Sequence, residues 1–402
     1  MIMGICIFQL LCCIGFIACA PLNLKTEPVL PFSTKAPDLD TFGSLPLVNP
    51  ESEVDIFTNI LKVNQDSKNN EYPVTQGDII LPKPGRMATT CTRCLWPKSV
   101  DGIVYVPYTI APKGFTASNM ETIRRAMLEY ETLTCIRFVN RTKEKDFLTI
   151  SYSSSCTSFI GRIGGGQVVQ LNPDGCLYQG SIQHELHHAL GFYHEVSRPD
   201  RDEHILVKTE FIDPSYLNQF AIFDGNTLDL PYDYNSVMHY SRYAFTINAS
   251  VPVLIPIPDP NVPIGQRIGL SVLDIQKVNK LYKCDVPCST LLNGESGTFT
   301  SNNFPSQYPN NMSCTWLIRV PRGQAALTFN YINIQETDEC VSDYIRIYDG
   351  PTKNHPVLLD KACGTPNLPM IIASTYHMLI EFVSDNSVPS AGFNASYKSG
   401  II

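Results

Sequence analysis

The sequence predicts two folded domains: a mixed domain of helices and strands over residues 87–285, then an antiparallel β-sandwich over residues 288–398. Three observations support this prediction. A chain of 402 residues is long enough for two or three domains with separate cores. Apolar residues at helical spacing alternate with strand-like segments in the first region. After Cys284 only short alternating segments remain, separated by turn residues.

The overall composition is that of a globular protein with no nucleic-acid partner. Charged residues make up 17% of the chain and apolar residues 44%. The formal net charge of -8 leaves no basic footprint of the kind that nucleic-acid binding requires.

The first twenty residues, 1–20, form an apolar run that ends in small residues. The run is too short and too early to favour a membrane span, although no Lys or Arg precedes it and Pro21 directly follows the expected cut. We interpret it as a signal peptide. Because no later segment is long and apolar enough to be a membrane anchor, we expect a secreted, extracellular protein.

Residues 21–86 are rich in Pro, Asn, Asp and Ser and are predicted to be a propeptide with one short helix over residues 53–65. Arg86 is an isolated basic residue in an exposed turn, so a trypsin-like protease could cut the Arg86–Met87 bond. The alternative interpretation of this segment is a simple linker.

The mixed domain contains helices and strands with recognisable ends. Thr116 or Ser118 is expected to cap the first helix and Ser271 the last. The expected elements are a strand at 106–110, a helix at 116–134, a strand at 146–152, a glycine-rich loop and edge strand within 163–176, and a helix at 271–284.

The cysteine content agrees with export. Of fourteen cysteines, ten lie after the predicted signal peptide, an even number that should pair as disulfides in an oxidising compartment. Cys91-x-x-Cys94 could instead bind zinc, but no second ligand pair with matching spacing is evident. Four candidate glycosylation sequons are compatible with export: Asn140, Asn248, Asn311 and Asn394.

A histidine-rich motif begins at His184. His184 and His188 are four residues apart, so on a helix they share one face. Glu185 is rotated from His184 by about 100° and could reach a metal-held water without binding the metal. Two imidazoles that hold zinc, beside a carboxylate that takes a proton, are what metal-assisted hydrolysis needs. Gly191 can end the helix in a sharp turn that returns His194 as a third ligand.

Three residues in or near this motif are not expected to bind the metal. His187 could replace His188 as a ligand, but that choice breaks the spacing to Gly191 and His194; we expect it to be solvated or to support a ligand. His204 is expected in a surface or salt-bridged loop. Met238, in the segment "YNSVMHY", would provide an apolar floor under a three-histidine site.

The segments "HELHHALGFYHEVSRPDRD" and "SVMHY", with "LWPKSVDGIVYVPYTI" and "IGQRIGLSVLDIQKVNKLYKC", resemble the astacin family of zinc endopeptidases within the metzincins. The resemblance spans roughly residues 72–285. It implies an α+β astacin-like catalytic domain, with a twisted sheet, long helices and a zinc ion in the cleft.

The resemblance also assigns roles to residues. One Zn²⁺ would be held by His184, His188 and His194, with Glu185 as general base. Tyr240 would be a displaceable fifth ligand that stabilises the oxyanion. Glu195 would contact the new N-terminus of the mature enzyme. The family disulfides would be Cys135–Cys284 and Cys156–Cys176.

Latency is implied by the segment "TQGD". Family members keep an aspartate in the water position of the zinc, and here Asp78 takes that place, although Thr75 replaces the usual phenylalanine of the motif. Cleavage after Arg86 would remove Asp78. The extra pair Cys91–Cys94 resembles the hatching-enzyme branch of fish and amphibians.

The C-terminal segment resembles a CUB domain, with the disulfides Cys288–Cys314 and Cys340–Cys363. Some CUB domains bind Ca²⁺ through three acidic residues. Asp343 and Asp385 match, but Gln335 stands where a glutamate is expected, which weakens a hard-cation site and makes Ca²⁺ doubtful. Two acids on an exposed sandwich loop is an equally good interpretation.

Together these features predict a secreted zymogen of a zinc endopeptidase that cuts extended extracellular polypeptides, with egg-envelope glycoproteins as the expected substrate. The CUB domain would bind an extracellular glycoprotein or matrix, and a trypsin-like protease would activate the precursor. One alternative is a growth-factor or matrix-processing astacin protease, although the chain lacks an EGF-type cysteine cluster. The other is a CUB-mediated binding protein with a vestigial protease domain.

Overall fold

The computed structural model describes most of the chain beyond residue 55. The described ranges are 56–66, 72–81, 94–111, 113–266, 268–286 and 288–400. The predicted signal peptide, the Arg86–Met87 bond and Cys91 lie outside them.

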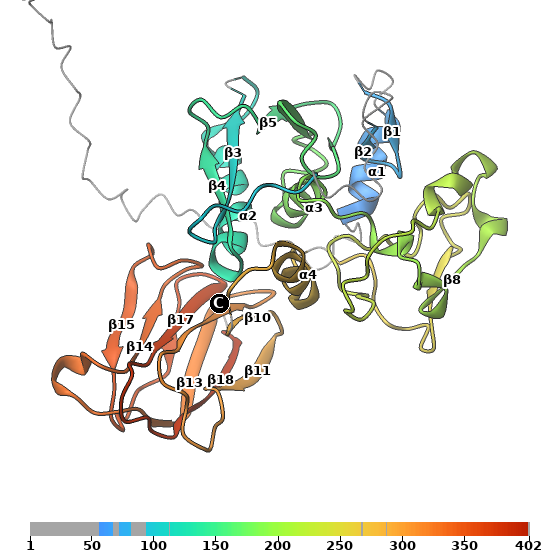
Figure 1. Cartoon of the computed structure of the whole chain (residues 1–402). Coiled ribbons are helices and arrows are strands. Elements are labelled where there is room, and N and C mark those ends of the chain that lie inside the picture. Colours follow the sequence, from blue (N-terminus) through green and yellow to red (C-terminus); the bar gives the residue numbers. More distant parts are fainter. Residues whose placement is uncertain are drawn as a thin grey trace, which may run out of the picture. The chain divides into compact units, whose positions relative to one another are not determined.

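The first folded region contains four α-helices and nine strands among the described residues (Figure 1). The helices are α1 (Ile56–Asp66), α2 (Ala117–Leu133), α3 (Gln179–Ala189) and α4 (Val272–Tyr282). The strands are β1 (Val74–Thr75), β2 (Ile79–Ile80), β3 (Val104–Ile110), β4 (Ile136–Asn140), β5 (Phe147–Tyr152), β6 (Thr157–Ser158), β7 (Gly166–Leu171), β8 (Ile205–Val207) and β9 (Leu254–Pro256).

Helix ends follow the local sequence. Thr116 caps α2 and forms a reciprocal capping box with Asn119, while Ser271 caps α4 and does the same with Asp274. Each box pairs a side-chain oxygen with a free N–H of the first turn. The predicted caps at Thr116 and Ser271 are therefore confirmed, and so is the short helix predicted within residues 53–65, which is α1.

Seven strands form one sheet in the order β1-β2-β6-β7-β5-β3-β4. Strands β3, β4, β5 and β7 are parallel, whereas β6 turns back antiparallel to β7. The prediction that β7 is an edge strand is wrong, because β6 covers it. With two residues, β6 is too short to show an alternating pattern in sequence.

The segment predicted to be a propeptide contributes two strands to this sheet. Strand β2 pairs in parallel with β6 through Ile79 and Ser158, and β1 folds back onto β2. Helix α1 lies beside α3 (Figure 1). Strands β1 and β2 therefore occupy one end of the seven-stranded sheet.

The second region consists of two sheets, as predicted for a β-sandwich. One has the order β10-β12-β17-β14-β15 and the other β11-β18-β13-β16, and all pairs are antiparallel except β10 with β12. The strands are β10 (Ser289–Leu292), β11 (Ser296–Thr300), β12 (Ser313–Arg319), β13 (Ala325–Asn333), β14 (Tyr344–Tyr348), β15 (Val357–Ala362), β16 (Ile371–Ile372), β17 (His377–Val383) and β18 (Gly392–Ser399).

Disulfides stabilise both regions. The structure contains Cys135–Cys284, Cys156–Cys176, Cys288–Cys314 and Cys340–Cys363. The first closes the largest loop, with a sequence separation of 149 between its cysteines, and links the end of α2 to the end of α4. None of the helices in the described ranges has the length and apolar character needed to cross a bilayer.

Candidate active site

Helix α3 carries the first two histidines of the motif and ends where the sequence predicts. The helix ends at Ala189 and is followed by Gly191, whose φ of 110° lies in the left-handed region that favours glycine. The Gly191 N–H donates to the carbonyl of His188 (2.8 Å). This turn returns the chain so that His194 joins His184 and His188.

The three imidazole rings are oriented by oxygen acceptors on their Nδ1 side. Nδ1 of His184 lies 2.8 Å from the carbonyl of Val237, in the turn that contains Met238. Nδ1 of His188 lies 2.8 Å from the carbonyl of Phe192. Because a carbonyl only accepts, Nδ1 carries the proton in both rings, and Nε2 keeps its lone pair. The third ring, His194, has Nδ1 2.9 Å from the side-chain oxygen of Gln76.

The carboxylate of Asp78 lies among the three Nε2 atoms. Its Oδ2 is 2.8 Å from His184 Nε2 and 3.3 Å from His194 Nε2. Its Oδ1 is 3.4 Å from His188 Nε2, and all four side chains are fully buried. Burial alone would raise the pKa of Asp78, but the three histidines hold it well below its usual range. The anionic carboxylate is therefore the form that this pocket favours.

The same atoms fit a metal ion. The three imidazole nitrogens and the Asp78 oxygen all lie within 4.8 Å of one another. In the described part of the chain, Asp78 Oδ1 and His188 Nε2 are buried without a hydrogen-bond partner. Buried polar atoms are rarely left unpaired, so such atoms indicate an ion or a ligand. Three imidazoles with one oxygen donor is a ligand set that suits zinc.

Glu185 is buried beside this cluster. Among the described residues neither of its carboxylate oxygens has a hydrogen-bond partner. Burial, together with the negative charge of Asp78, raises the pKa of Glu185 well above its usual range. A carboxyl group with a raised pKa and free oxygens can exchange protons during a reaction.

Tyr240 contacts two residues of the predicted propeptide, Gln76 and Phe57. Its hydroxyl donates toward the carbonyl oxygens of Gln76 and Gln219, each at 3.2 Å. The ring of Phe57 from α1 stacks on the Tyr240 ring, with centroids 3.9 Å apart and planes at 11°. Phe57 also packs against the edge of His194. Sequence reasoning did not find Phe57 or Gln76, although Gln76 lies between Thr75 and Gly77 in the recognised motif.

Asn64 of α1 links the predicted propeptide to the catalytic region. Its amide nitrogen donates to the carbonyls of Gly77 and Cys156 (2.7 Å each), and its oxygen accepts from the Cys156 N–H (2.8 Å). The Ser158 N–H donates to the carbonyl of Asp78 (3.1 Å). Asp78 is therefore held in place by β6 through Ser158, and its neighbour Gly77 by α1 through Asn64.

Glu195 is buried in a charged cluster behind the site. Lys277 Nζ lies 2.6 Å from Glu195 Oε2, and the Asp233 N–H donates to Oε1 (2.9 Å). Burial and the neighbouring Asp274 raise the pKa of Asp233 to about 7. The contact predicted between Glu195 and a new N-terminus stays a prediction, because the residues around Met87 lie outside the described ranges.

The other histidines of the motif are not in the metal cluster. His187 is fully buried, so the expectation that it is solvated is wrong. Its ring stacks on Phe192, and Nδ1 lies 3.2 Å from the Tyr130 hydroxyl. Burial lowers the pKa of His187 to about 3. His204 is half-buried and stacks on Tyr232, with ring centroids 4.7 Å apart.

The acidic residues of the sandwich are not an exposed loop pair. Asp343 is fully buried, accepts from the Tyr308 hydroxyl (2.6 Å) and accepts from the Asp385 N–H (2.7 Å). The expectation of two exposed acids is therefore wrong for Asp343, because it supports this loop from inside. Gln335 has a buried side-chain oxygen with no hydrogen-bond partner among the described residues.

Three of the four sequon asparagines are exposed. These are Asn140, Asn248 and Asn311. Asn394 is half-buried, and its oxygen accepts from Asn330 (2.7 Å). Glycosylation at these positions stays a prediction.

Comparisons with known proteins match two families along the chain. Residues 92–283 match the model of the peptidase family Astacin, and residues 288–397 match the CUB domain. Embryonic protein UVS.2 of Xenopus laevis is 51% identical over 352 residues, covering 88% of this chain and 67% of the relative. The astacin-like metalloendopeptidase of Gallus gallus is 44% identical, covering 86% of this chain and 84% of the relative.

A solved structure also matches the catalytic region. It is high choriolytic enzyme 1 of Oryzias latipes, described as a hatching enzyme zinc-protease, with 46% sequence identity. The match covers 48% of this chain and 95% of that chain, with a TM-score of 0.46.

Proposed function

The chain belongs to the astacin family of zinc metalloendopeptidases and carries a CUB domain, and on that premise we propose that it is a secreted zymogen acting on egg-envelope glycoproteins. Residues 1–20 would be the signal peptide and residues 21–86 the propeptide. The observation that carries the proposal is the Asp78 carboxylate of the propeptide, enclosed by the three imidazoles of the motif.

His184, His188 and His194 are the proposed zinc ligands. The Nδ1 contacts to backbone oxygens direct Nε2 of His184 and of His188 toward the Asp78 carboxylate, where they meet Nε2 of His194. A zinc ion bound there supplies Lewis-acid chemistry, which polarises the attacked carbonyl and activates water. Met238, 2% exposed, lies in the turn whose backbone orients His184.

Glu185 is the proposed general base. Its oxygens have no competing hydrogen-bond partners among the described residues, so they are available to accept the proton of the attacking water. The same carboxyl group can then donate that proton to the leaving amine. Removal of Asp78 takes away one of the two causes that raise the pKa of Glu185, which favours its basic form.

Tyr240 is proposed to stabilise the negatively charged oxygen of the tetrahedral intermediate. In the precursor its hydroxyl is directed to Gln76 and Gln219 instead. Burial and the charge of Asp78 raise the pKa of Tyr240 well above its usual value, so the hydroxyl keeps its proton and can donate a hydrogen bond. Loss of Phe57 and Gln76 with the propeptide would release the ring.

Activation is proposed to follow cleavage of the Arg86–Met87 bond by a trypsin-like protease. Cleavage separates Asp78, Gln76 and Phe57 from the catalytic domain, which frees the metal site and the rim strand β6 together. An extended substrate could then add to the edge that β2 occupies in the precursor. Glu195, already paired with Lys277, is the proposed partner of the new N-terminus.

The proposed substrate rests on the relatives. The fish relatives are named high and low choriolytic enzymes, and one is described as a hatching enzyme zinc-protease. The CUB domain would bind an extracellular glycoprotein or matrix. The alternative within the same class is an enzyme that processes growth factors or matrix proteins.

The proposal is tested by treating the precursor with trypsin and offering egg-envelope glycoproteins and procollagen separately. We expect zinc-dependent cuts in the envelope proteins, mapped by mass spectrometry, and an intact procollagen. A Glu185→Ala precursor treated in the same way is the control: any cuts that it produces come from residual trypsin. Preferential cutting of procollagen would favour the alternative substrate class, and no cutting of any protein would contradict the proposed function.

A further inference from the structure

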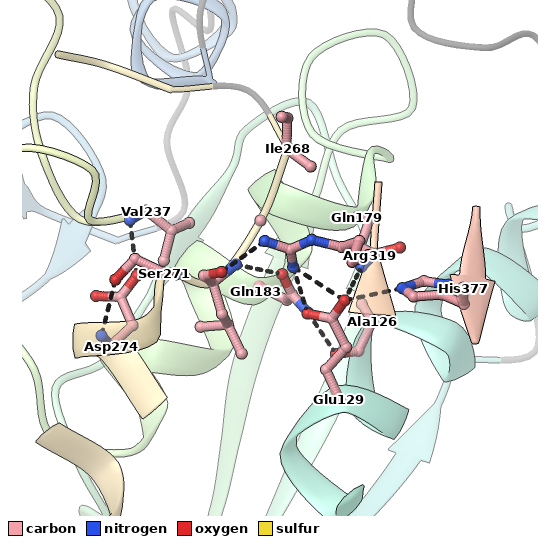
Figure 2. A network of polar contacts seen from close by, with 12 residues as sticks. Ala126, Glu129, Gln179, Gln183, Val237, Ile268, Ser271, Asp274, Arg319 and His377 are labelled. Atoms are coloured by element: carbon pink, nitrogen blue, oxygen red, sulfur yellow. Dashed lines mark hydrogen bonds and ion pairs between the residues drawn. The ribbon is translucent and has the colours of Figure 1, made fainter. Parts of the chain in front are cut away.

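A second buried charged cluster joins the sandwich to the catalytic domain (Figure 2). Nη1 of Arg319, at the end of β12, lies 2.9 and 2.7 Å from the two carboxylate oxygens of Glu129 in α2. His377, the first residue of β17, places Nε2 3.0 Å from Glu129 Oε1. Glu129 is 0% exposed, and Arg319 and His377 are 2% exposed. The CUB domain therefore inserts a cation into the interior of the protease.

The same carboxylate binds the helix that carries the zinc motif. Gln183 directly precedes His184, and its amide nitrogen donates to Glu129 Oε2 (2.9 Å). Gln179, one turn earlier in α3, donates to Glu129 Oε1 (2.9 Å). Figure 2 shows Gln179 and Gln183 of α3 around the carboxylate, with Arg319 and His377 of the sandwich. Glu129 thus connects two residues of α3 to two residues of the CUB domain.

Arg319 reaches the active-site helix by a second route as well. Its Nη2 donates to the carbonyl of Leu270 (2.6 Å), and the Leu270 N–H donates to the side-chain oxygen of Gln183 (2.9 Å). Gly269 makes this approach possible, because a Cβ there would lie 2.4 Å from the Gln183 oxygen and 3.0 Å from Arg319 Nη1. The side chain of Gln183 is consequently fixed at both its nitrogen and its oxygen.

Around these polar contacts, the catalytic domain and the sandwich share a hydrophobic core. The main hydrophobic cluster of the catalytic domain includes apolar residues of the sandwich that are 5% exposed or less: Leu291, Leu317, Tyr348 and Leu379. Tyr376, next to His377, donates its hydroxyl to the side-chain oxygen of Gln179 (3.1 Å). Thr132, at the end of α2, donates to the carbonyl of Pro351 (2.7 Å). Dry packing of this kind holds two elements in one geometry.

The effect of the Glu129 carboxylate on α3 depends on whether its negative charge is paired with Arg319. Burial by itself would raise the pKa of Glu129, but Arg319 above all, with His377 and Gln183, lowers it to about 2, so the group is an anion. A buried anion that loses its cation must attract water or shift position. Either response would move Gln179 and Gln183, and with them the start of the His184 to His188 turn.

We propose that Arg319 of the CUB domain is a positioning residue for the peptidase reaction, acting through Glu129 and Gln183 to hold the zinc-binding helix in place. The CUB domain is then part of the catalytic unit rather than only a module that recruits substrate. This inference rests on the proposed endopeptidase function. Displacement of a ligand-bearing helix by a fraction of an ångström is enough to slow a reaction substantially.

The test uses the full chain with Arg319→Met, Arg319→Lys and the matched control Arg322→Met. Arg322 lies in the same domain but is exposed, and it pairs with the exposed Glu295 at 2.8 Å. After trypsin activation, a short peptide substrate is used because it is too small to need recruitment by the CUB domain. We expect Arg319→Met to lower kcat by about tenfold or more, with KM changed less than about twofold. Arg319→Lys should recover part of the loss, and Arg322→Met should match wild type.

A second readout does not depend on activity. Amide hydrogen exchange of the uncleaved precursors should be faster in Arg319→Met than in wild type, and the increase should be larger over residues 179–189 than over the strands β3, β4 and β5. Unaltered kcat and unaltered exchange in that helix would overturn the inference, as would a loss that appears only in KM for large protein substrates. An equal increase in exchange throughout the catalytic domain would also overturn it, because it indicates general destabilisation without a local effect on α3. If activated wild type fails to cut the peptide, the proposed function fails, whereas the exchange result still tests the role of Arg319.

Discussion

Asp78 and Glu129 are both fully buried carboxylates, and both contact helix α3, but on different faces of it. Asp78 meets His184 and His188, while Glu129 meets Gln179 and Gln183. Both anions have a lowered pKa, so charge and burial alone do not separate them. The difference lies in how completely their neighbourhoods are hydrogen-bonded.

Around Asp78 several buried polar atoms lack hydrogen-bond partners within the described residues: Asp78 Oδ1, His188 Nε2 and both oxygens of Glu185. Around Glu129 both carboxylate oxygens are paired, and Arg319 Nε is the unpaired atom of that cluster in the described ranges. Unpaired buried atoms are costly and persist where a ligand or a reaction uses them. This difference supports the proposal that the first cluster is the chemical site and the second is its support.

The largest expected effect concerns the chemical cluster. Glu185→Ala should lower kcat by about 10²–10⁴-fold, because the general base is lost, while zinc stays bound through the three histidines. Zinc content of the purified variant and peptide turnover after trypsin activation measure the two quantities. Turnover near the wild-type rate would contradict the assignment of Glu185. Glu203→Ala, an exposed carboxylate nearby in the sequence, is the matched control.

The supporting cluster should respond through stability. Arg319→Met should reduce the free energy of unfolding by about 3–5 kcal/mol, because it leaves Glu129 buried without its cation. The double variant Glu129→Met with Arg319→Met should lose much less, since neither charge remains. Urea unfolding with intact disulfides measures both. Equal losses in the single and double variants would show that packing rather than charge pairing holds this cluster.

Acid should weaken the supporting cluster in a defined pH window. The pKa of Glu129 falls from its ordinary 4.5 to about 2 on folding, so its stabilising contribution is complete above pH 4.5 and is lost as the pH falls toward 2. Because Glu129→Gln does not titrate, the variant should lose less stability than wild type between pH 5 and 3, by about 2 kcal/mol. Unfolding midpoints at each pH measure the difference. Glu295→Gln, at an exposed carboxylate, should follow wild type; identical slopes for wild type and Glu129→Gln would reject the shift.

The smallest expected effect concerns latency. Asp78→Ala in the uncleaved precursor should raise basal peptide cleavage by about tenfold, but not to the level of the activated enzyme, because Gln76 and Phe57 still hold His194 and Tyr240. Adding Phe57→Ala should raise cleavage further. Uncleaved precursor is confirmed on gels during the assay. A precursor that stays fully inactive after Asp78→Ala would count against the role of that carboxylate.

Local rules were sufficient for much of the catalytic region. The spacing of His184, His188 and His194 with Gly191 predicted a convergent cluster, because the helical repeat and one left-handed turn determine where those side chains lie. The caps at Thr116 and Ser271 were equally predictable, since a capping box is formed within four residues. Asp78 was recognised through the resemblance of its motif to a family, and the structure places it among the histidines.

Other features depended on contacts between distant segments. The sequence has Thr75 where the family motif has a phenylalanine. Only the fold shows that Phe57 of α1 stacks on Tyr240. The two-residue strand β6 has no pattern of its own, so β7 was mistaken for an edge. For His187 the sequence left open whether it is solvated or supports a ligand, because periodicity places it beside the ligands but does not tell what covers it.

By itself, then, the sequence determined the three histidines and Glu185 of the chemical site and the kinds of domain, because these follow from spacing along one helix with its terminal turn and from alternation along single strands. The tertiary structure alone decided that Arg319 of β12 and Glu129 of α2, 190 residues apart, form one buried pair behind the zinc-binding helix. No local pattern encodes such a pair. It depends on which apolar surfaces of the two domains pack together, and that is decided by their shapes after each has folded.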